Sequence, residues 1–184
     1  MGIRGTRTDR GAPRALTAAA AFAALCAPAH AADHQGTATA TVVRPNTLVK
    51  TDDLDFGTLI SGTSGGTVTI NAATGARTAA GGVTTVGGGE QRAIFQGTGG
   101  IILITVTGSN SVSLMRAGGG AAPLTASLTR AATTSGGGIA LLGTSATLLP
   151  SGVQTYYIGG TLTVPANQPE GDYSGSFTLT VNYL

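Results

Sequence analysis

The last fourteen residues constrain the fold more than any other stretch, because they alternate between apolar and polar side chains. Period two is the pattern of a β-strand with one covered face, and Phe, Tyr, Val and Thr suit a pleated surface. We therefore predict a strand from Tyr173 to Tyr183 in the interior of the fold, with a neighbouring strand on each side. The residues of its apolar parity are Tyr173, Gly175, Phe177, Leu179, Val181 and Tyr183.

The rest of the chain also favours β-structure. Glycine supplies 30 of the 184 residues, only 10% are charged, and Thr, Val, Ile and Ser alternate repeatedly. This composition predicts an all-β fold, a single immunoglobulin-like β-sandwich. The glycines between positions 81 and 89 indicate a loop or weak hairpin. The predicted strands lie within residues 37–43, 48–60, 65–71, 92–96, 101–107, 111–116, 124–128, 139–149, 154–164 and 173–183, and the last two are expected to pair.

The amino terminus has the features of a secretory signal peptide over residues 1–31. Four arginines precede an apolar run of about 13 residues, which is short of the roughly 20 that cross a bilayer as a helix. Ala29-His30-Ala31 is a small-x-small cleavage site. We expect export to the periplasm, cell surface or extracellular space, with residues 32–184 forming the sandwich domain and no transmembrane segment in the mature chain.

Loss of the leader would change the charge and the thiol content. Of ten basic and eight acidic residues, four arginines and Asp9 would leave, so six basic and seven acidic residues give a formal charge of −1. A nucleic-acid partner is therefore not expected. Cys26, the only cysteine, would also leave.

The residue inventory offers no catalytic or cofactor site. His34 is the one histidine after the leader, so neither a Ser-His-Asp arrangement nor a zinc site can be assembled. Asp52, Asp53 and Asp55 lack the ligand spacing of a calcium loop, and a solvated strand edge explains them better. We expect a protein that is not an enzyme and has no cofactor and no metal.

Three motifs resemble known families. Gly171 fourteenth from the end, Tyr183 second from the end and the apolar alternation between them resemble the carboxyl-terminal motif of chaperone–usher pilins. Asp53-Leu54-Asp55-Phe56-Gly57 is similar to the early strand of spore-coat-protein-U-type pilin domains. Residues 157–164 followed by residues 171–175 resemble an uncharacterised family of secreted, glycine-rich, pilin-like bacterial proteins. The resemblance covers about residues 37 to 184.

The resemblance implies a non-catalytic, secreted structural protein, a pilin-like surface or fimbrial subunit that acts through strand pairing. In such pilins a periplasmic chaperone, and then the extension of a like subunit, fills a groove beside the final strand. The groove residues would be Gly171, Tyr173, Phe177, Leu179, Val181 and Tyr183.

Residues 36–43 are the candidate donor strand, with Ala38, Ala40 and Val42 as its inserted side chains. Alternatively, these residues form the domain's own first strand. The protein would then be a self-contained secreted adhesive or ligand-binding module that stays monomeric.

Overall fold

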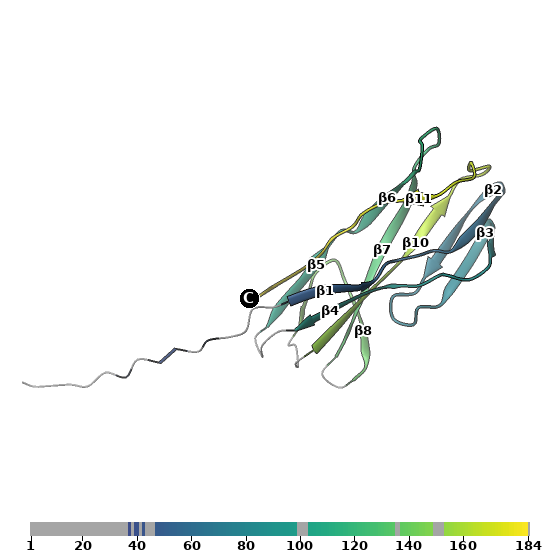
Figure 1. The fold of residues 1–184 in the computed structure, drawn as a ribbon. Helices are drawn as coiled ribbons and strands as arrows, with labels where there is room; N and C mark the ends of the chain where they lie inside the picture. Colours follow the sequence, from purple (N-terminus) through teal and green to yellow (C-terminus); the bar gives the residue numbers. More distant parts are fainter. Residues whose placement is uncertain are drawn as a thin grey trace, which may run out of the picture. The chain divides into compact units, whose positions relative to one another are not determined.

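The computed structural model describes residues 37, 39–40, 42, 47–98, 103–134, 137–148 and 153–183 (Figure 1). The chain divides into two units, Met1–Thr41 and Val42–Leu184, and all the strands belong to the second. The predicted signal peptide and Ala38 lie outside the described residues. Within the described residues, no helix is long and apolar enough to cross a membrane.

The described residues form strands and no helix, which confirms the predicted all-β class. The strands are β1 (Thr47–Asp52), β2 (Thr58–Ile70), β3 (Arg77–Val86), β4 (Ala93–Thr98), β5 (Ile104–Gly108), β6 (Ser111–Arg116), β7 (Leu124–Thr133), β8 (Ile139–Leu142), β9 (Ala146–Leu148), β10 (Val153–Val164), β11 (Tyr173–Ser174) and β12 (Leu179–Tyr183).

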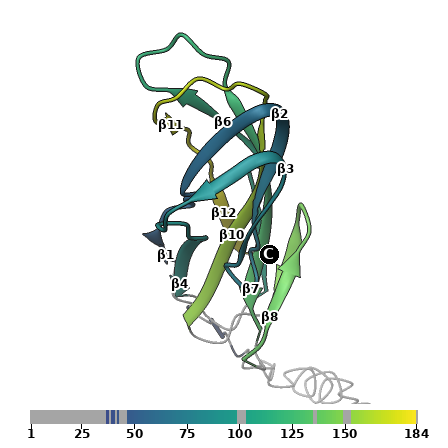
Figure 2. The ribbon, with the colours of Figure 1, turned by 90° about the vertical axis from the view of Figure 1, so that its right-hand side faces the viewer.

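Two curled antiparallel sheets make a β-sandwich (Figure 2). The larger sheet has the order β1-β4-β10-β7-β6-β11, with β2 joining β10, β3 joining β2 and β8 joining β7. The smaller sheet has the order β12-β5-β9. β10 is the central strand, because it pairs with β7 along one edge and with β4 and then β2 along the other.

The core consists of two clusters of apolar side chains between the sheets. β10 contributes to both, since Tyr156, Ile158 and Leu162 are each at most 2% exposed. The larger cluster joins β10 to β2, β6 and β7, and the smaller one joins it to β5 and β7. Alternation along β10 therefore puts one complete face of the strand into the core.

Arg130 and Tyr156 each bury a polar group in the fold. The Arg130 guanidinium donates to the Ser109 carbonyl, to Asn110 Oδ1 at 3.0 Å and to the Gly143 carbonyl at 3.3 Å, and burial lowers its pKa. The Tyr156 hydroxyl has no hydrogen-bond partner among the described residues. Burial raises the pKa of Tyr156 to about 12, because the charged phenolate would lose its hydration.

The structure corrects three sequence predictions. β10 does not pair with the carboxyl-terminal segment, whose two strands β11 and β12 pair with β6 and β5 and end their sheets. The predicted interior strand is therefore an edge. Gly81 and Gly82, predicted in a loop, belong to the ten-residue strand β3, because β2 pairs along it, whereas Gly87, Gly88 and Gly89 lie after the end of β3 and outside any strand. The described residues among 37–43 lie in no strand, and Ala40 and Val42 are exposed.

Candidate functional site

The two ends of the larger sheet face each other across an open groove. Residues 53–61, which follow β1, line one wall, and residues 168–177, around β11, line the other. Two adjoining cavities of about 860 Å³ and 600 Å³ occupy the groove. Apolar side chains from β6, β7 and β10 form its floor: Val112, Leu114, Leu124, Leu162 and Val164.

The first wall is one extended edge. β1 pairs with β4 from Thr47 opposite Thr98 to Asp52 opposite Ile94, with a register shift between Lys50 and Asp52, and the bridge between Asp55 and Gln91 continues the shifted register. The Asp55 and Gln91 backbones exchange two hydrogen bonds of 2.9 Å. Residues 47–55 thus use their ladder hydrogen bonds on the β4 side, away from the groove.

A sharp corner ends this wall. Phe56 turns into the core and is 6% exposed, while Gly57 takes a positive φ of 76°. Asp55 Oδ1 accepts a 2.7 Å hydrogen bond from the Gly57 amide, and Arg77 donates to the Phe56 carbonyl at 3.2 Å. A positive φ is easily adopted only by glycine, so the Asp-Phe-Gly sequence itself builds the corner.

The second wall is also paired on one side only. The Asp172 carbonyl accepts from the Ala117 amide at 2.8 Å, and the Thr178 carbonyl accepts from the Ser109 amide at 2.9 Å. Together with the β11–β6 and β12–β5 ladders, these bonds all run toward β5, β6 and the residues next to them. Among the described residues, the opposite edge of the segment has no strand partner.

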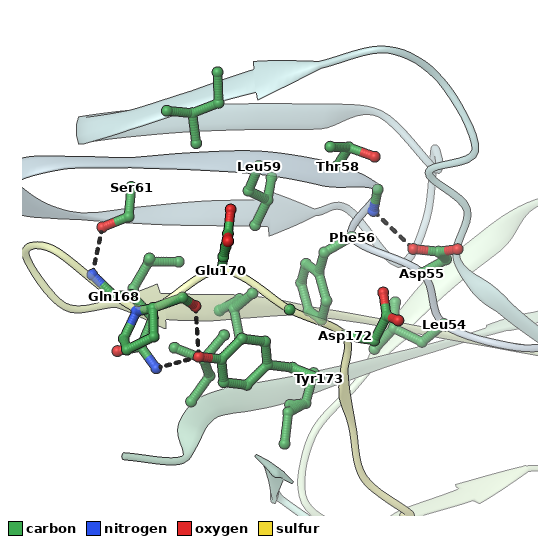
Figure 3. A pocket seen from close by; sticks show the side chains of 18 of the residues that line it. Leu54, Asp55, Phe56, Thr58, Leu59, Ser61, Gln168, Glu170, Asp172 and Tyr173 are labelled. Carbon is green, nitrogen blue, oxygen red and sulfur yellow. Dashed lines mark hydrogen bonds between the residues drawn. The ribbon is translucent and has the colours of Figure 1, made fainter. Parts of the chain in front are cut away.

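The connection after β10 closes one end of the groove (Figure 3). Ser61 Oγ donates to the Pro165 carbonyl and accepts from the Gln168 amide, both at 2.9 Å. The Tyr173 hydroxyl donates to the Pro169 carbonyl at 2.7 Å and accepts from Gln168 Nε2 at 3.0 Å. These bonds hold Tyr173 in place at the closed end.

Gly171 lets the second wall pass over Arg116. A Cβ atom at Gly171 would lie 2.6 Å from Arg116 Nε, and its φ of 138° is one that side chains rarely adopt. Arg116 Nε donates to the Glu170 carbonyl at 2.7 Å. The positive φ and the nearby Arg116 side chain explain why glycine occupies position 171.

Acidic side chains rim the groove. Asp55 projects from the first wall, and Glu170 and Asp172 come from the second (Figure 3). Asp53 also lines the groove but forms an exposed ion pair of 2.6 Å with Lys50. Among the described residues, the other three carboxylates form no salt bridge.

The structure divides the predicted groove residues into two sets. Gly171, Tyr173 and Phe177 line the cavities, whereas Leu179 and Val181 lie farther along and pack on the smaller core cluster. Tyr183 pairs with Ile104 through its backbone, and its side chain lies outside the described residues.

Sequence reasoning missed most of the floor. Leu114 and Leu124 belong to two separate predicted strands, and no local pattern indicates that they converge. Leu54 and Phe56, in contrast, carry a signal, because they alternate with the aspartates of a short acidic stretch. The apolar member of such an alternation points to the covered side.

The arrangement suits the binding of an extended chain better than chemistry. In the described part of the chain, no three His, Cys, Asp or Glu side chains gather to hold a metal ion. Residues 53–55 and 173–174 each have a strand partner on one side only within the described part of the chain, and an apolar floor between two such edges has room for a further strand.

An open β-sandwich with a groove between its sheet ends is thus the class that fold and site define. A family model described as a domain of unknown function (DUF4402) matches residues 47–183, from β1 to β12, so the chain belongs to this family. No curated protein matches the chain. No solved structure matches it.

Proposed function

We propose that this protein is a non-catalytic, exported structural subunit of the pilin-like kind, which acts by accepting a β-strand from another chain. The observation that supports this most strongly is the pair of facing sheet ends over an apolar floor. A strand inserted between them would extend both sheet ends at once. The strand would be donated by a chaperone during export and by a like subunit at the surface.

The backbone explains why such a groove binds strands. An exposed strand edge presents amide and carbonyl groups at the spacing of the next strand, and most proteins cover or charge such edges. Here the edges lie above leucine and valine side chains. Covering that floor would contribute roughly 25 cal/mol for each Å² of apolar surface removed from water.

Analytical ultracentrifugation of the purified exported protein tests this proposal. We expect the wild type to self-associate with increasing concentration, and Leu114→Arg, in the floor, to sediment as a monomer. The matched control is Met115→Arg, because Met115 is the next residue of β6 and is 61% exposed. It should associate like the wild type.

Circular dichroism melting would verify that both variants are folded. Leu59→Arg, on the opposite side of the groove, provides a second blocking variant if Leu114→Arg does not fold. A wild-type protein that remains a stable monomer at all concentrations would overturn the proposal. It would favour a self-contained adhesive or ligand-binding module.

A further inference from the structure

Most of the exposed large apolar side chains gather at one end of the sandwich. In the described part of the chain nine such side chains are exposed, and five of them lie at this end, between 41% and 69% exposed. They come from β1, from β8, from the start of β10 and from the residue before β5. The five residues of this apolar end are Val49, Leu103, Ile139, Leu141 and Val153.

The strand pairing places these residues at the same end. The last residue of β4, Thr98, lies opposite the first residues of β1 and of β10. The first residue of β8 lies opposite the last residue of β7, beside the start of β10. The start of β5 pairs with the end of β9, which precedes β10 by only a few residues. In Figure 2 the ends of β4, β8 and β10 lie at the bottom of the ribbon, and β6 and β11 lie at the top.

The apolar end carries almost no charge. Residues 93–115 and 131–169 contain no Asp, Glu, Lys, Arg or His, and they include all of β4, β5, β8, β9 and β10. Among the described residues of β1 and β7, the nearest charged ones are Lys50 and Arg130, each three residues from its strand end, or roughly 10 Å. Lys50 pairs with Asp53, and Arg130 is buried.

These features fit a lipid surface better than a protein partner. Protein interfaces are enriched in Tyr, Trp, Phe, Met and Arg, whereas the five exposed side chains here are Val, Leu or Ile. They come from strands of both sheets and line neither cavity of the groove. Aliphatic side chains enter lipid favourably and charged ones do so at a cost, so an uncharged end with projecting aliphatic groups suits a bilayer.

The size of the apolar end matches shallow insertion. Val49 and Leu141 lie deepest in their strands, each two residues from the first residue, which is roughly 7 Å. Interfacial protein segments bury their apolar side chains roughly 5–10 Å into the boundary between headgroups and acyl chains. Lys50, at roughly 10 Å, would then stay at the lipid surface.

We propose that the apolar end docks on the surface of a lipid bilayer, with its aliphatic side chains inserted at the level of the headgroups. This contact is separate from the groove, because none of its five residues lines the groove cavities. It would orient the protein on a membrane and leave the groove open to solvent.

Vesicle sedimentation of the purified exported protein tests the proposal. We expect the wild type to bind phosphatidylcholine vesicles and to stay bound in 1 M NaCl, where charges are screened beyond roughly 3 Å. Val153→Asp combined with Ile139→Asp should weaken the partition into vesicles about tenfold, because a charged side chain enters lipid unfavourably.

Met115→Asp combined with Val86→Asp is the matched control. These side chains are 61% and 41% exposed, against 63% for Val153 and 41% for Ile139. They lie away from the apolar end, because Met115 pairs with β11 and Val86 pairs with the start of β2. The control should bind vesicles like the wild type, and circular dichroism melting would verify that both double variants are folded.

A fluorescent label gives a second readout that needs no loss of binding. An environment-sensitive fluorophore is attached to Val153→Cys in a Cys26→Ser background, which removes the only native thiol. Its emission should shift to the blue when phosphatidylcholine vesicles are added. The same label on Ser127→Cys, an exposed position of β7, should show no shift.

The outcomes separate lipid from other partners. A wild type that did not bind vesicles, or equal loss of binding in the two double variants, would overturn the proposal. Binding only to vesicles that contain phosphatidylglycerol, with release in 1 M NaCl, would also overturn it, because charges would then make the contact. Loss of self-association in the Val153 and Ile139 variant, without vesicle binding by the wild type, would replace lipid by a second copy of the chain. Sedimentation of Leu114→Arg tests the groove separately.

Discussion

β10 and the carboxyl-terminal segment have similar sequences but different surroundings. Both alternate apolar and polar residues and contain tyrosine and paired or spaced glycines. β10 has strands along both edges, and seven of its twelve residues are buried. Among the described residues, the carboxyl-terminal segment pairs only with β6 and β5, one for each of its strands, and its apolar side chains are only partly buried.

The number of paired edges is what distinguishes β10 from the carboxyl-terminal segment. Alternation in the sequence shows which face of a strand is covered, but it carries no information about whether the strand's edges are paired. Edge pairing makes β10 the part that holds the sheet together. Among the described residues, the carboxyl-terminal segment has no strand partner along one edge. Substitutions of equivalent residues in the two regions should therefore have unequal effects.

The largest expected effect is at Gly159 in β10. A Cβ atom there would lie 2.2 Å from the Ile70 carbonyl oxygen and 2.6 Å from the Ala72 amide nitrogen, both backbone atoms of a buried region. We expect Gly159→Ala to lower the free energy of unfolding by about 3 kcal/mol, because overpacking in a dense core cannot relax. Urea denaturation would measure this loss.

Gly88→Ala is the control for that experiment. Nothing lies within 4 Å of a Cβ at Gly88, and its φ is not positive. Its free energy of unfolding should stay within about 0.5 kcal/mol of the wild type. Similar losses for the two variants would mean that β10 is not the tightly packed centre of the sheet.

The sequence predicts the core strands better than the edges. β6 was predicted with its bounds, Ser111–Arg116, because period two and turn residues mark both ends. The pairing of β11 and β12 was not predictable, since it depends on β6 and β5, which lie over fifty residues earlier in the chain and in different sheets. The groove floor was not predictable for a similar reason. Leu114 and Leu162 come together because the sheet curves, and no local sequence pattern indicates that curvature.

A second contrast lies between two tyrosine hydroxyls. The Tyr173 hydroxyl in the carboxyl-terminal segment has two hydrogen bonds, whereas that of Tyr156 in β10 has none among the described residues. The folded-state pKa of Tyr156, about 12, exceeds the unfolded value of 10. Between these values the unfolded chain releases a proton that the folded chain keeps, so stability falls as pH rises. The expected loss is about 2 kcal/mol from pH 10 to 12.

Urea denaturation at several pH values would show this loss. Tyr156→Phe should abolish it, and at pH 7 the variant should be as stable as the wild type or slightly more so, because a hydroxyl without a partner is removed. Tyr157→Phe should keep the alkaline loss, since Tyr156 remains. An alkaline loss that persists in Tyr156→Phe would assign it to another group.

The smallest expected effect is at Gly175, the carboxyl-terminal counterpart of Gly159. A Cβ atom at Gly175 would lie 2.2 Å from the Ser113 carbonyl oxygen, as close as the contact calculated for Gly159. The two glycines differ in how easily the surrounding backbone can shift. Residues 175–178 lie between β11 and β12 and border the open groove. The segment can shift into that space.

We expect Gly175→Ala to lower the free energy of unfolding by about 1 kcal/mol, measured by urea denaturation, which is a third of the loss at Gly159. Equal losses at the two glycines would show that the carboxyl-terminal segment is held as firmly as β10, and an edge held that firmly would have no room to admit another strand.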